Sequence, residues 1–128
     1  MPSAVADGTS FSMANSAGYK EFLTDLLSGF GPVSIRNMFG GAGVYAEGVM
    51  FAIVVDDTLY LKVDEVSAEA FAAEGKHPFT YRPKGRAPVA MSYWEIPERL
   101  LDDPEELAVW AGRAHDIALA AKTKPKRR

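Results

Sequence analysis

The sequence predicts an α+β domain in which three helices accompany a mainly antiparallel sheet, formed by a meander of three or four strands and a later hairpin. Two observations predict this class. Three predicted helices are separated by groups of strand-like runs, whereas a doubly wound fold would alternate single strands and helices. The connections within each group are short, as antiparallel neighbours allow and parallel neighbours do not.

The first helix is expected to begin at Tyr19, because apolar residues recur at helical spacing from there to Phe30. Glycines and a proline directly after Phe30 end it. Four strand-like stretches follow, separated by short turns rich in glycine or aspartate: "VSIRNMF", "AGVY", "VMFAIVV" and "TLYLKV". These stretches predict the meander.

The second half of the chain predicts a helix, a hairpin and a last helix. Asp64 or Ser67 caps a short helix through "AEAFAAEG", which ends at Gly75. "PFTYRP" and "PVAMSYWEI" form the arms of the hairpin around the basic loop "KGR". The last helix begins at the "DPEE" segment, with Asp103 as N-cap and a proline at the first helical position. Its apolar face comprises Leu107, Trp110, Ala111, Ala114, Ile117, Ala118 and Ala121.

The stretch "NMFGGAGVYAEGVMFAIV" contains a motif that suggests a nucleotide cofactor. Gly41 to Ala46 fits the dinucleotide fingerprint G-x-G-x-x-G/A, which requires a helix to begin at the glycines. The residues that follow are rich in β-branched side chains and have no polar stripe, so they predict a buried strand. We therefore expect no cofactor, and expect the glycines to shape the sheet through positive φ or close strand crossing: Gly40, Gly41, Gly43 and Gly48. The large side chains around them are expected in the core: Met38, Phe39, Tyr45, Met50 and Phe51.

Composition bounds the class of protein. At 128 residues and 48% hydrophobic content, the chain is expected to form one domain over residues 16–121, with a mobile N-terminal arm at 1–15 and a basic disordered tail at 122–128. It has no cysteine, which excludes disulfides and thiolate nucleophiles. The N-terminus has no signal-peptide pattern, and the longest apolar run is too short for a membrane helix. We expect a soluble cytoplasmic protein.

The charge is divided unevenly along the chain. All 17 acidic residues and 9 of the 14 basic residues lie in 1–121, which gives 9 − 17 = −8, and the five basic tail residues bring the total to −3. Domains that track phosphates normally show the reverse balance. Any direct binding of DNA is therefore expected to be weak, non-specific and dependent on the tail residues Lys122, Lys124, Lys126, Arg127 and Arg128.

Catalytic and metal-binding patterns are missing from the sequence. The two histidines, His77 and His115, fall in different predicted elements, and neither has a second ligand at metal-binding spacing. His77 is expected in a loop and His115 on a helix surface. The adjacent acidic residues sit where turns and helix caps already explain them. The sequence thus predicts no catalytic residue and no metal site, and the protein is not expected to be an enzyme.

Two candidate binding sites remain. Basic and aromatic residues meet at the second hairpin, either as a solvated turn beside core aromatics or as a contact patch for an acidic protein surface or a phosphate: Tyr81, Arg82, Lys84, Arg86, Tyr93 and Trp94. The other candidate is a small-ligand pocket lined by Tyr45, Tyr60 and Trp94, together with Lys62. The sequence leaves a contact patch, a nucleic-acid-binding module and a ligand pocket open.

The apolar run at 49–55 predicts self-association. Regular alternation places Val49, Phe51, Ile53 and Val55 on one face of the strand, and the remaining apolar residues Met50, Ala52 and Val54 on the other. If the helices cover only one face, a second copy of the chain is expected to cover the other. The sequence therefore predicts a homodimer.

Five motifs in order resemble the N-terminal domain of the TfoX/Sxy family of bacterial competence regulators. They are M-F-G-G-x-G-x-Y at Met38 to Tyr45, G-x-M-F-A at Gly48 to Ala52, L-Y-L-K at Leu59 to Lys62, F-x-Y at Phe79 to Tyr81 and M-S-Y-W at Met91 to Trp94. The resemblance runs from the first helix to Arg113 and covers the N-terminal half of the full-length regulators, so the chain is expected to be a stand-alone form without their C-terminal domain. It implies a five-stranded, largely antiparallel sheet, similar to the YjbR-like and secretion-chaperone-like folds.

The function implied by the resemblance is regulatory. The family implies a transcriptional co-regulator that acts by protein contact rather than an enzyme, with the cyclic-AMP receptor protein as the associated partner. A protein partner similar to that transcription factor is therefore expected here. The resemblance brings no catalytic residues with it.

Overall fold

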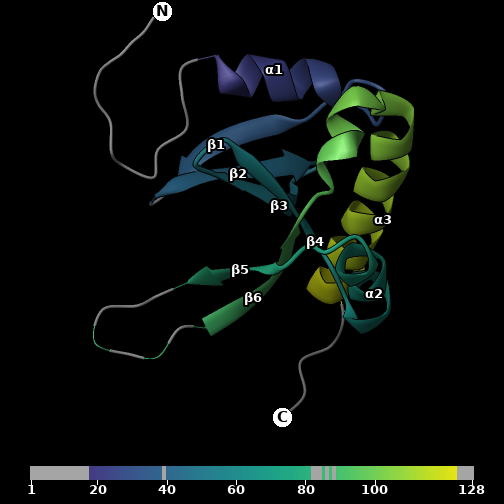
Figure 1. Ribbon diagram of the computed structural model, residues 1–128. Coiled ribbons are helices and arrows are strands. Elements are labelled where there is room, and N and C mark those ends of the chain that lie inside the picture. Colours follow the sequence, from purple (N-terminus) through teal and green to yellow (C-terminus); the bar gives the residue numbers. More distant parts are fainter. Residues whose placement is uncertain (1–17, 39, 82–84, 86, 88, 124–128) are drawn as a thin grey trace, which may run out of the picture.

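The computed structural model describes residues 18–38, 40–81, 85, 87 and 89–123. Its elements follow the order predicted from the sequence, and the α+β class is confirmed (Figure 1). The helices are α1 (Tyr19–Leu26), α2 (Glu65–Ala73), the 3-10 helix η2 (Glu98–Asp102) and α3 (Pro104–Thr123). The strands are β1 (Ser34–Met38), β2 (Gly41–Ala46), β3 (Val49–Val55), β4 (Thr58–Lys62), β5 (Pro78–Tyr81) and β6 (Val89–Glu95).

The sheet has six strands, so the expected count of five was wrong. Its order is β1-β2-β3-β4-β6-β5, and every neighbouring pair is antiparallel. The count of five was implied by the family resemblance, whereas the six strands correspond to the six strand-like stretches of the sequence, including the edge strand Ser34 to Met38, which pairs along its whole length with β2. The later hairpin joins the same sheet, because β6 pairs with β4.

Two tight turns connect the strands from β2 to β4 in the meander. Glu47 and Gly48 connect β2 to β3 with φ of +54° and +78°, and Asp56 and Asp57 connect β3 to β4 with φ of +54° and +59°. Positive φ at both central residues is the geometry of two-residue hairpin turns whose twist matches that of the strands. The predicted turn at Asp56-Asp57 is confirmed.

The helix caps also follow the sequence. The Asp64 carboxylate accepts a hydrogen bond of 2.8 Å from the Ser67 backbone N–H, and the Asp64 backbone N–H donates to the Ser67 hydroxyl at 3.0 Å. This reciprocal pair is a capping box, in which Asp64 is the N-cap. At α3, the Asp103 carboxylate accepts a hydrogen bond from the Glu106 backbone N–H at 3.2 Å, as predicted.

A bulge in β3 changes which residues face the core. Val44 is paired with Ala52, but Tyr45 is paired with Met50, so β3 holds one extra residue, Phe51, at this point. An extra residue shifts the side-chain alternation by one position. Val49, Phe51, Ala52 and Val54 therefore pack with the helices, whereas Met50, Ile53 and Val55 face the other way. The regular alternation expected for this strand was wrong.

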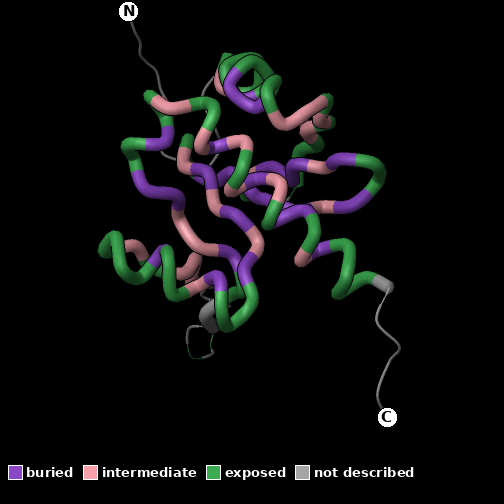
Figure 2. Tube along the Cα trace, turned by 90° about the vertical axis from the view of Figure 1, so that its right-hand side faces the viewer, coloured by how far each residue is buried: buried purple, intermediate pink, exposed green. Residues whose placement is uncertain are grey.

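The main core lies between the sheet and the helices. Figure 1 shows α2 and α3 on one side of the curved sheet and α1 above β1, while the β5–β6 hairpin projects away from the helices. We call the covered side the helix face. The largest fully buried side chains of this core are Phe51, Leu23, Leu27, Leu59, Leu61, Leu100 and Leu107. Figure 2 shows the buried positions along the strands and the exposed positions at the turns.

Arg99 of η2 forms hydrogen bonds with residues at the end of α2 and in α3. Its guanidinium donates to the Glu74 carboxylate after α2 at 2.6 Å and to the Glu106 carboxylate in α3 at 2.8 Å. The indole N–H of Trp110 donates to the same Glu106 carboxylate at 3.0 Å. These hydrogen bonds from Arg99 keep the pKa values of Glu74 and Glu106 below their ordinary range.

The Arg99 network predicts a pH-dependent contribution to stability. A carboxylate whose pKa is lower in the folded state stabilises the fold above its unfolded pKa of about 4.3, and this contribution is lost as the pH falls through the folded pKa. Arg99→Gln should therefore lower the melting temperature near neutral pH. The decrease should be modest, because the Arg99, Glu74 and Glu106 side chains are partly exposed and their charges are screened by solvent. The difference from wild type should shrink as the pH falls below about 4.

The check is a series of thermal melts across this pH range. Lys20→Gln, a change at an exposed cation on α1, serves as the control and should show no such trend. A difference between wild type and Arg99→Gln that grows toward acid pH would rule out this role for the network.

Candidate functional site

The sheet has a second face, opposite the helix face, where aromatic, sulfur-containing and cationic side chains gather. Register places its members in rows, because directly paired residues point to the same side of a sheet. Arg36 is paired with Gly43, and Gly43 is paired with Ile53. Ile53 is in turn paired with Tyr60. We define the second face as Arg36, Met38, Gly43, Tyr45, Met50, Ile53, Val55, Tyr60, Lys62, Phe79 and Tyr93.

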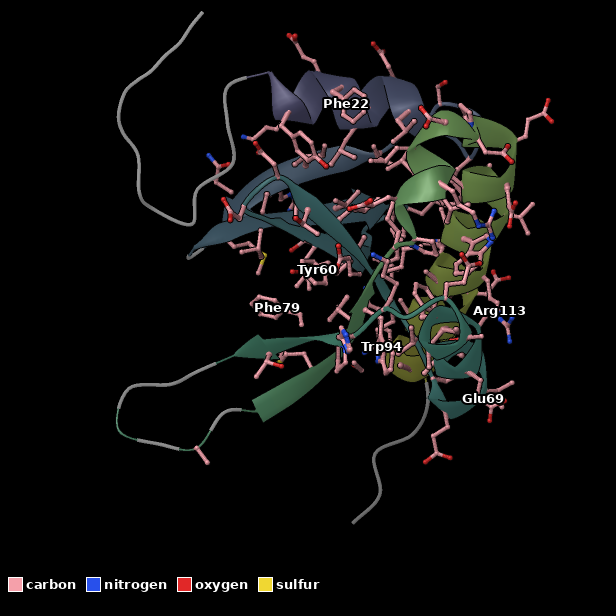
Figure 3. All side chains as sticks on the ribbon, in the orientation of Figure 1. Phe22, Tyr60, Glu69, Phe79, Trp94 and Arg113 are labelled. Carbon is pink, nitrogen blue, oxygen red and sulfur yellow. The ribbon has the colours of Figure 1, made fainter. Side chains whose placement is uncertain are left out.

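A small apolar cluster occupies the centre of the second face. Ile53, Val55 and Tyr93 are buried there, although no helix in the described part of the chain packs on this side. Tyr60 and Phe79 lie edge to face with ring centroids 5.3 Å apart, and Figure 3 shows both between the meander and the projecting hairpin. Burial raises the pKa values of the Tyr60 and Tyr93 hydroxyls above their ordinary range.

Two cations flank this cluster. The Arg36 guanidinium lies 4.8 Å from the centroid of the Tyr45 ring, and the Lys62 ammonium lies 5.1 Å from that of Tyr93. Both distances are within the range of a cation–π contact. Lys62 also donates a hydrogen bond to the Ser92 hydroxyl at 2.9 Å. The second face thus presents positive charge held against aromatic rings.

Gly43 lies beneath a group of flexible side chains on this face. A Cβ atom at Gly43 would lie 2.7 Å from the Met50 sulfur, 2.9 Å from the Met38 sulfur and 3.1 Å from the Tyr45 ring. Met38 is 43% exposed, because β1 is an edge strand, so its expected place in the core was wrong. Tyr45 and Met50 are half-buried on the second face, and only Phe51 belongs to the main core. Phe39 lies outside the described residues.

The basic and aromatic patch expected at the hairpin is only partly brought together. Tyr93 belongs to the second face, whereas Trp94 points to the helix face, where its ring centroid lies 6.4 Å from that of Phe71. Tyr81 is paired with Val89 near the end of the hairpin. The three basic residues of the patch, Arg82, Lys84 and Arg86, lie outside the described residues. Strand alternation separates Tyr93 from Trp94, a signal that the sequence already contained.

The expected ligand-pocket residues also fall at different places. Tyr60 packs against Phe79 on the second face, and Trp94 lies on the helix face. Tyr45 instead borders a cavity of about 400 Å³ that also contains His115. Lys62 borders a smaller cavity, of about 190 Å³, between α2 and α3. These four residues therefore do not converge on one pocket.

His115 is buried, so its predicted place on a helix surface was wrong. Its Nε2 lies 3.0 Å from the Ala46 carbonyl oxygen, which assigns the N–H to that nitrogen. The ring meets Phe51 edge to face at 5.8 Å and Phe30 at 5.9 Å. His115 lies one turn after Ala111 on the apolar face of α3, and this spacing would have predicted its burial. His77 lies in an exposed loop, as predicted.

The glycines shape the sheet, and the strand prediction for this stretch is confirmed. Gly40 and Gly48 adopt φ of +80° and +78°. At Gly41, a Cβ atom would lie 2.5 Å from the Val54 carbonyl oxygen. The residues after the fingerprint form β3 directly, so no helix begins at the glycines to bind a pyrophosphate.

Within 18–38, 40–81 and 89–123, no three histidine or acidic side chains are grouped so that they could hold a metal ion. Over the same ranges, no helix combines the length and apolar character needed to cross a bilayer.

Comparison with known proteins identifies a family and a relative. The chain matches the family model described as the TfoX N-terminal domain over residues 25–118. It is 30% identical over 102 residues to Protein Sxy of Escherichia coli (strain K12), in an alignment that covers 77% of this chain and 47% of Sxy. The chain therefore spans about half the length of the curated relative that it matches.

Proposed function

This chain belongs to the TfoX N-terminal domain family, and from that premise we propose that it is a non-enzymatic regulatory domain with a competence-related role. It acts by contacting another protein rather than by transforming a substrate. Support for a non-enzymatic role comes from the described histidines: the Nε2 of the buried His115 is taken up by the Ala46 carbonyl oxygen, and His77 is exposed in a loop.

The second face is the contact surface in this proposal. The observation that supports it is the pair of cation–π contacts, Arg36 on Tyr45 and Lys62 on Tyr93, at either side of a buried apolar cluster. Arginine, aromatic residues and methionine are enriched at protein interfaces, and methionine adapts its shape to a partner. The exposed Met38 supplies such a side chain. The partner surface that fits is apolar with acidic groups at its rim.

The proposed partner is a transcription factor similar to the cyclic-AMP receptor protein. In this arrangement the chain is a transcriptional co-regulator, and the basic residues Arg82, Lys84 and Arg86 add positive charge to the contact. A partner of this kind brings the DNA specificity that the acidic body of the chain lacks.

Affinity capture from a bacterial extract, followed by mass spectrometry, tests the proposal. Wild-type chain should enrich a transcription factor, Met38→Asp should lose it, and Arg82/Lys84/Arg86→Ala should retain less of it. Phe22→Asp on α1 is the matched control, because Phe22 and Met38 are both 43% exposed. The second face is not the contact surface if the wild-type chain enriches no transcription factor, or if Met38→Asp enriches one as well as the wild type does.

Self-association is also proposed for the second face. Ile53 and Val55 are already buried within one chain, which leaves the half-buried and exposed residues around them for a second copy. Sedimentation velocity at tens of micromolar should show a dimer that Met38→Asp shifts toward monomer. A monomer at this concentration would eliminate the homodimer.

Direct binding to DNA should be weak and should depend on the tail. Neutralisation of about five phosphates predicts a slope near −4 or −5 when the logarithm of the binding constant is plotted against that of the salt concentration. Removal of residues 122–128 should abolish the binding and leave the melting temperature nearly unchanged. Titration of a labelled duplex with intact and truncated protein measures both, and binding that survives truncation would refute this expectation.

A further inference from the structure

β1 is an edge strand, and the pairing of the meander fixes the direction of its backbone groups. Ala46 and Val49 are paired across the tight turn between β2 and β3, so their backbone groups point at each other. These groups alternate in direction along β2, because the bulge places its extra residue in β3. The backbone groups of Gly43 therefore point to β1, where Arg36 is the paired residue. The N–H and C=O of Arg36 are thus used within the sheet.

The outer side of β1 carries the N–H and C=O groups of Ile35 and Asn37, which flank Arg36. Among the residues that the structure describes, no hydrogen bond reaches these outer groups. α1 does not close this edge, because it packs on the core of the helix face through Leu23 and Leu26, and four of the five residues of β1 are exposed. A row of free backbone groups is a template on which another strand can pair.

The opposite edge of the sheet is protected against strand addition. β5 has four residues and begins with Pro78, which has no N–H, and its register with β6 shifts between Pro78 and Thr80. Short length, proline and irregular pairing are means by which proteins prevent the pairing of an edge. The five residues of β1 contain no proline and pair in regular register with β2. Figure 1 shows β1 and β5 at opposite ends of the sheet.

The charge on β1 selects what an added strand contains. Arg36 points to the second face, where its guanidinium lies 4.8 Å from the centroid of the Tyr45 ring and so extends over β2 rather than beyond the edge. Over 18–38, 40–81 and 89–123, no ion pair includes Arg36. β1 and β2 also contain no acidic residue. A carboxylate directly opposite Arg36 on an added strand would give this cation its partner.

The requirement for a carboxylate distinguishes a partner protein from a second copy of the chain. The residues of β1 are serine, isoleucine, arginine, asparagine and methionine, so a second β1 brings no carboxylate to Arg36. Met38 lies two residues after Arg36 on the same face and is 43% exposed, so an apolar side chain fits opposite it. The occupant that fits this edge is an extended segment with an acidic and an apolar residue at alternate positions.

We propose that the outer edge of β1 binds an extended segment of the partner protein by antiparallel strand addition, with an acidic side chain opposite Arg36 and an apolar side chain opposite Met38. The backbone groups of Ile35 and Asn37 form the new hydrogen bonds. The inference rests on the proposed function and deepens it, because Arg36 and Met38 belong to the second face. It states which kind of segment the partner offers there.

The test uses the full chain labelled with ¹⁵N and a capped synthetic peptide. The five central residues of the peptide are valine, threonine, glutamate, valine and threonine, an order that places the first valine opposite Met38 and glutamate opposite Arg36 in an antiparallel pair. At saturation, NMR-detected hydrogen exchange should be slowed about tenfold or more at the Ile35 and Asn37 amides. The amides of Arg36 and Met38, which are already bonded to β2, should change little.

Charge reversal tests the choice of partner. Arg36→Glu should weaken binding of the glutamate peptide by about threefold to tenfold, and a peptide with lysine in place of glutamate should bind this variant better than it binds wild type. Lys20→Glu, at an exposed cation on α1, is the matched control and should bind the glutamate peptide as wild type does.

A proline variant tests the backbone contact. Asn37→Pro removes an outer N–H and leaves the hydrogen bonds to β2 in place, so it should bind neither peptide and keep a melting temperature near that of wild type. If this variant is unstable, Arg36→Glu and the exchange measurement decide the test.

Three outcomes would overturn strand addition by a partner. They are unchanged exchange at Ile35 and Asn37 with excess peptide, equal binding of the glutamate peptide by Arg36→Glu, and protection of these two amides that rises with the concentration of the chain alone, which would indicate a second copy. The proposed function is tested separately by affinity capture. Capture of a transcription factor by wild type and by Asn37→Pro alike would keep that function and remove strand addition, whereas peptide binding without capture would remove the transcription factor and keep the edge as a binding site.

Discussion

Gly41→Ala is expected to lower the free energy of unfolding by about 3 kcal/mol or more, because the added Cβ has no space. It would lie 2.5 Å from the backbone oxygen of Val54 and 3.1 Å from a methyl group of Val55. A backbone oxygen in the centre of a sheet cannot move without disturbing the hydrogen bonds around it. Equilibrium urea unfolding of the variant measures the loss.

Gly43→Ala is the informative comparison. Its close neighbours are the sulfur atoms of Met50 and Met38, at 2.7 and 2.9 Å, which lie near the ends of flexible side chains and can move aside. The loss at Gly43 should therefore be about 1 kcal/mol, well below that at Gly41. Gly43 does not have positive φ, so a substitution there acts through crowding and not through backbone strain. Similar losses at the two glycines would contradict this explanation.

Phe51→Ala is expected to destabilise the fold by about 3 to 5 kcal/mol. Phe51 is fully buried, with its ring 5.1 Å from that of Phe30 and 5.8 Å from that of His115. Its removal leaves a cavity at the bulge where β3 turns an additional side chain toward the helices.

The control for this prediction is Phe22→Ala, which removes an equal number of atoms from an exposed position on α1. Its effect should stay within about 0.5 kcal/mol. Urea unfolding of both variants at the same pH compares them directly. A loss below about 1 kcal/mol for Phe51→Ala would mean that the bulge does not place this ring in the core.

The elements of this fold could be predicted where local chemistry decides them. The Asp64 and Asp103 caps, the turn at Asp56-Asp57 and the helical spacing in α3 depend on residues within one or two turns of each other. The same holds for the glycine-rich stretch, where β-branched residues indicate a strand. Such signals are local, and tertiary contacts did not override them.

The faces of the sheet could not be predicted in the same way. Phe51 and Ala52 point to the same side only because β2 and β3 pair with a bulge, and register between strands is not written in one strand alone. The sequence also did not predict the cavity between α2 and α3, because this cavity depends on how two helices far apart in the sequence pack on the sheet. By contrast, the separation of Tyr93 from Trp94 and the burial of His115 followed from simple periodicity that the sequence interpretation overlooked.

The most direct test of the proposed function is a titration of this chain with purified cyclic-AMP receptor protein, followed by isothermal calorimetry. The proposed function predicts saturable binding by wild type and by the Phe22→Asp control. It predicts loss of binding for a chain carrying both Arg36→Glu and Met38→Asp, because these remove a cation and an apolar contact from the second face. No measurable binding by wild type, or undiminished binding by the doubly substituted chain, would contradict it.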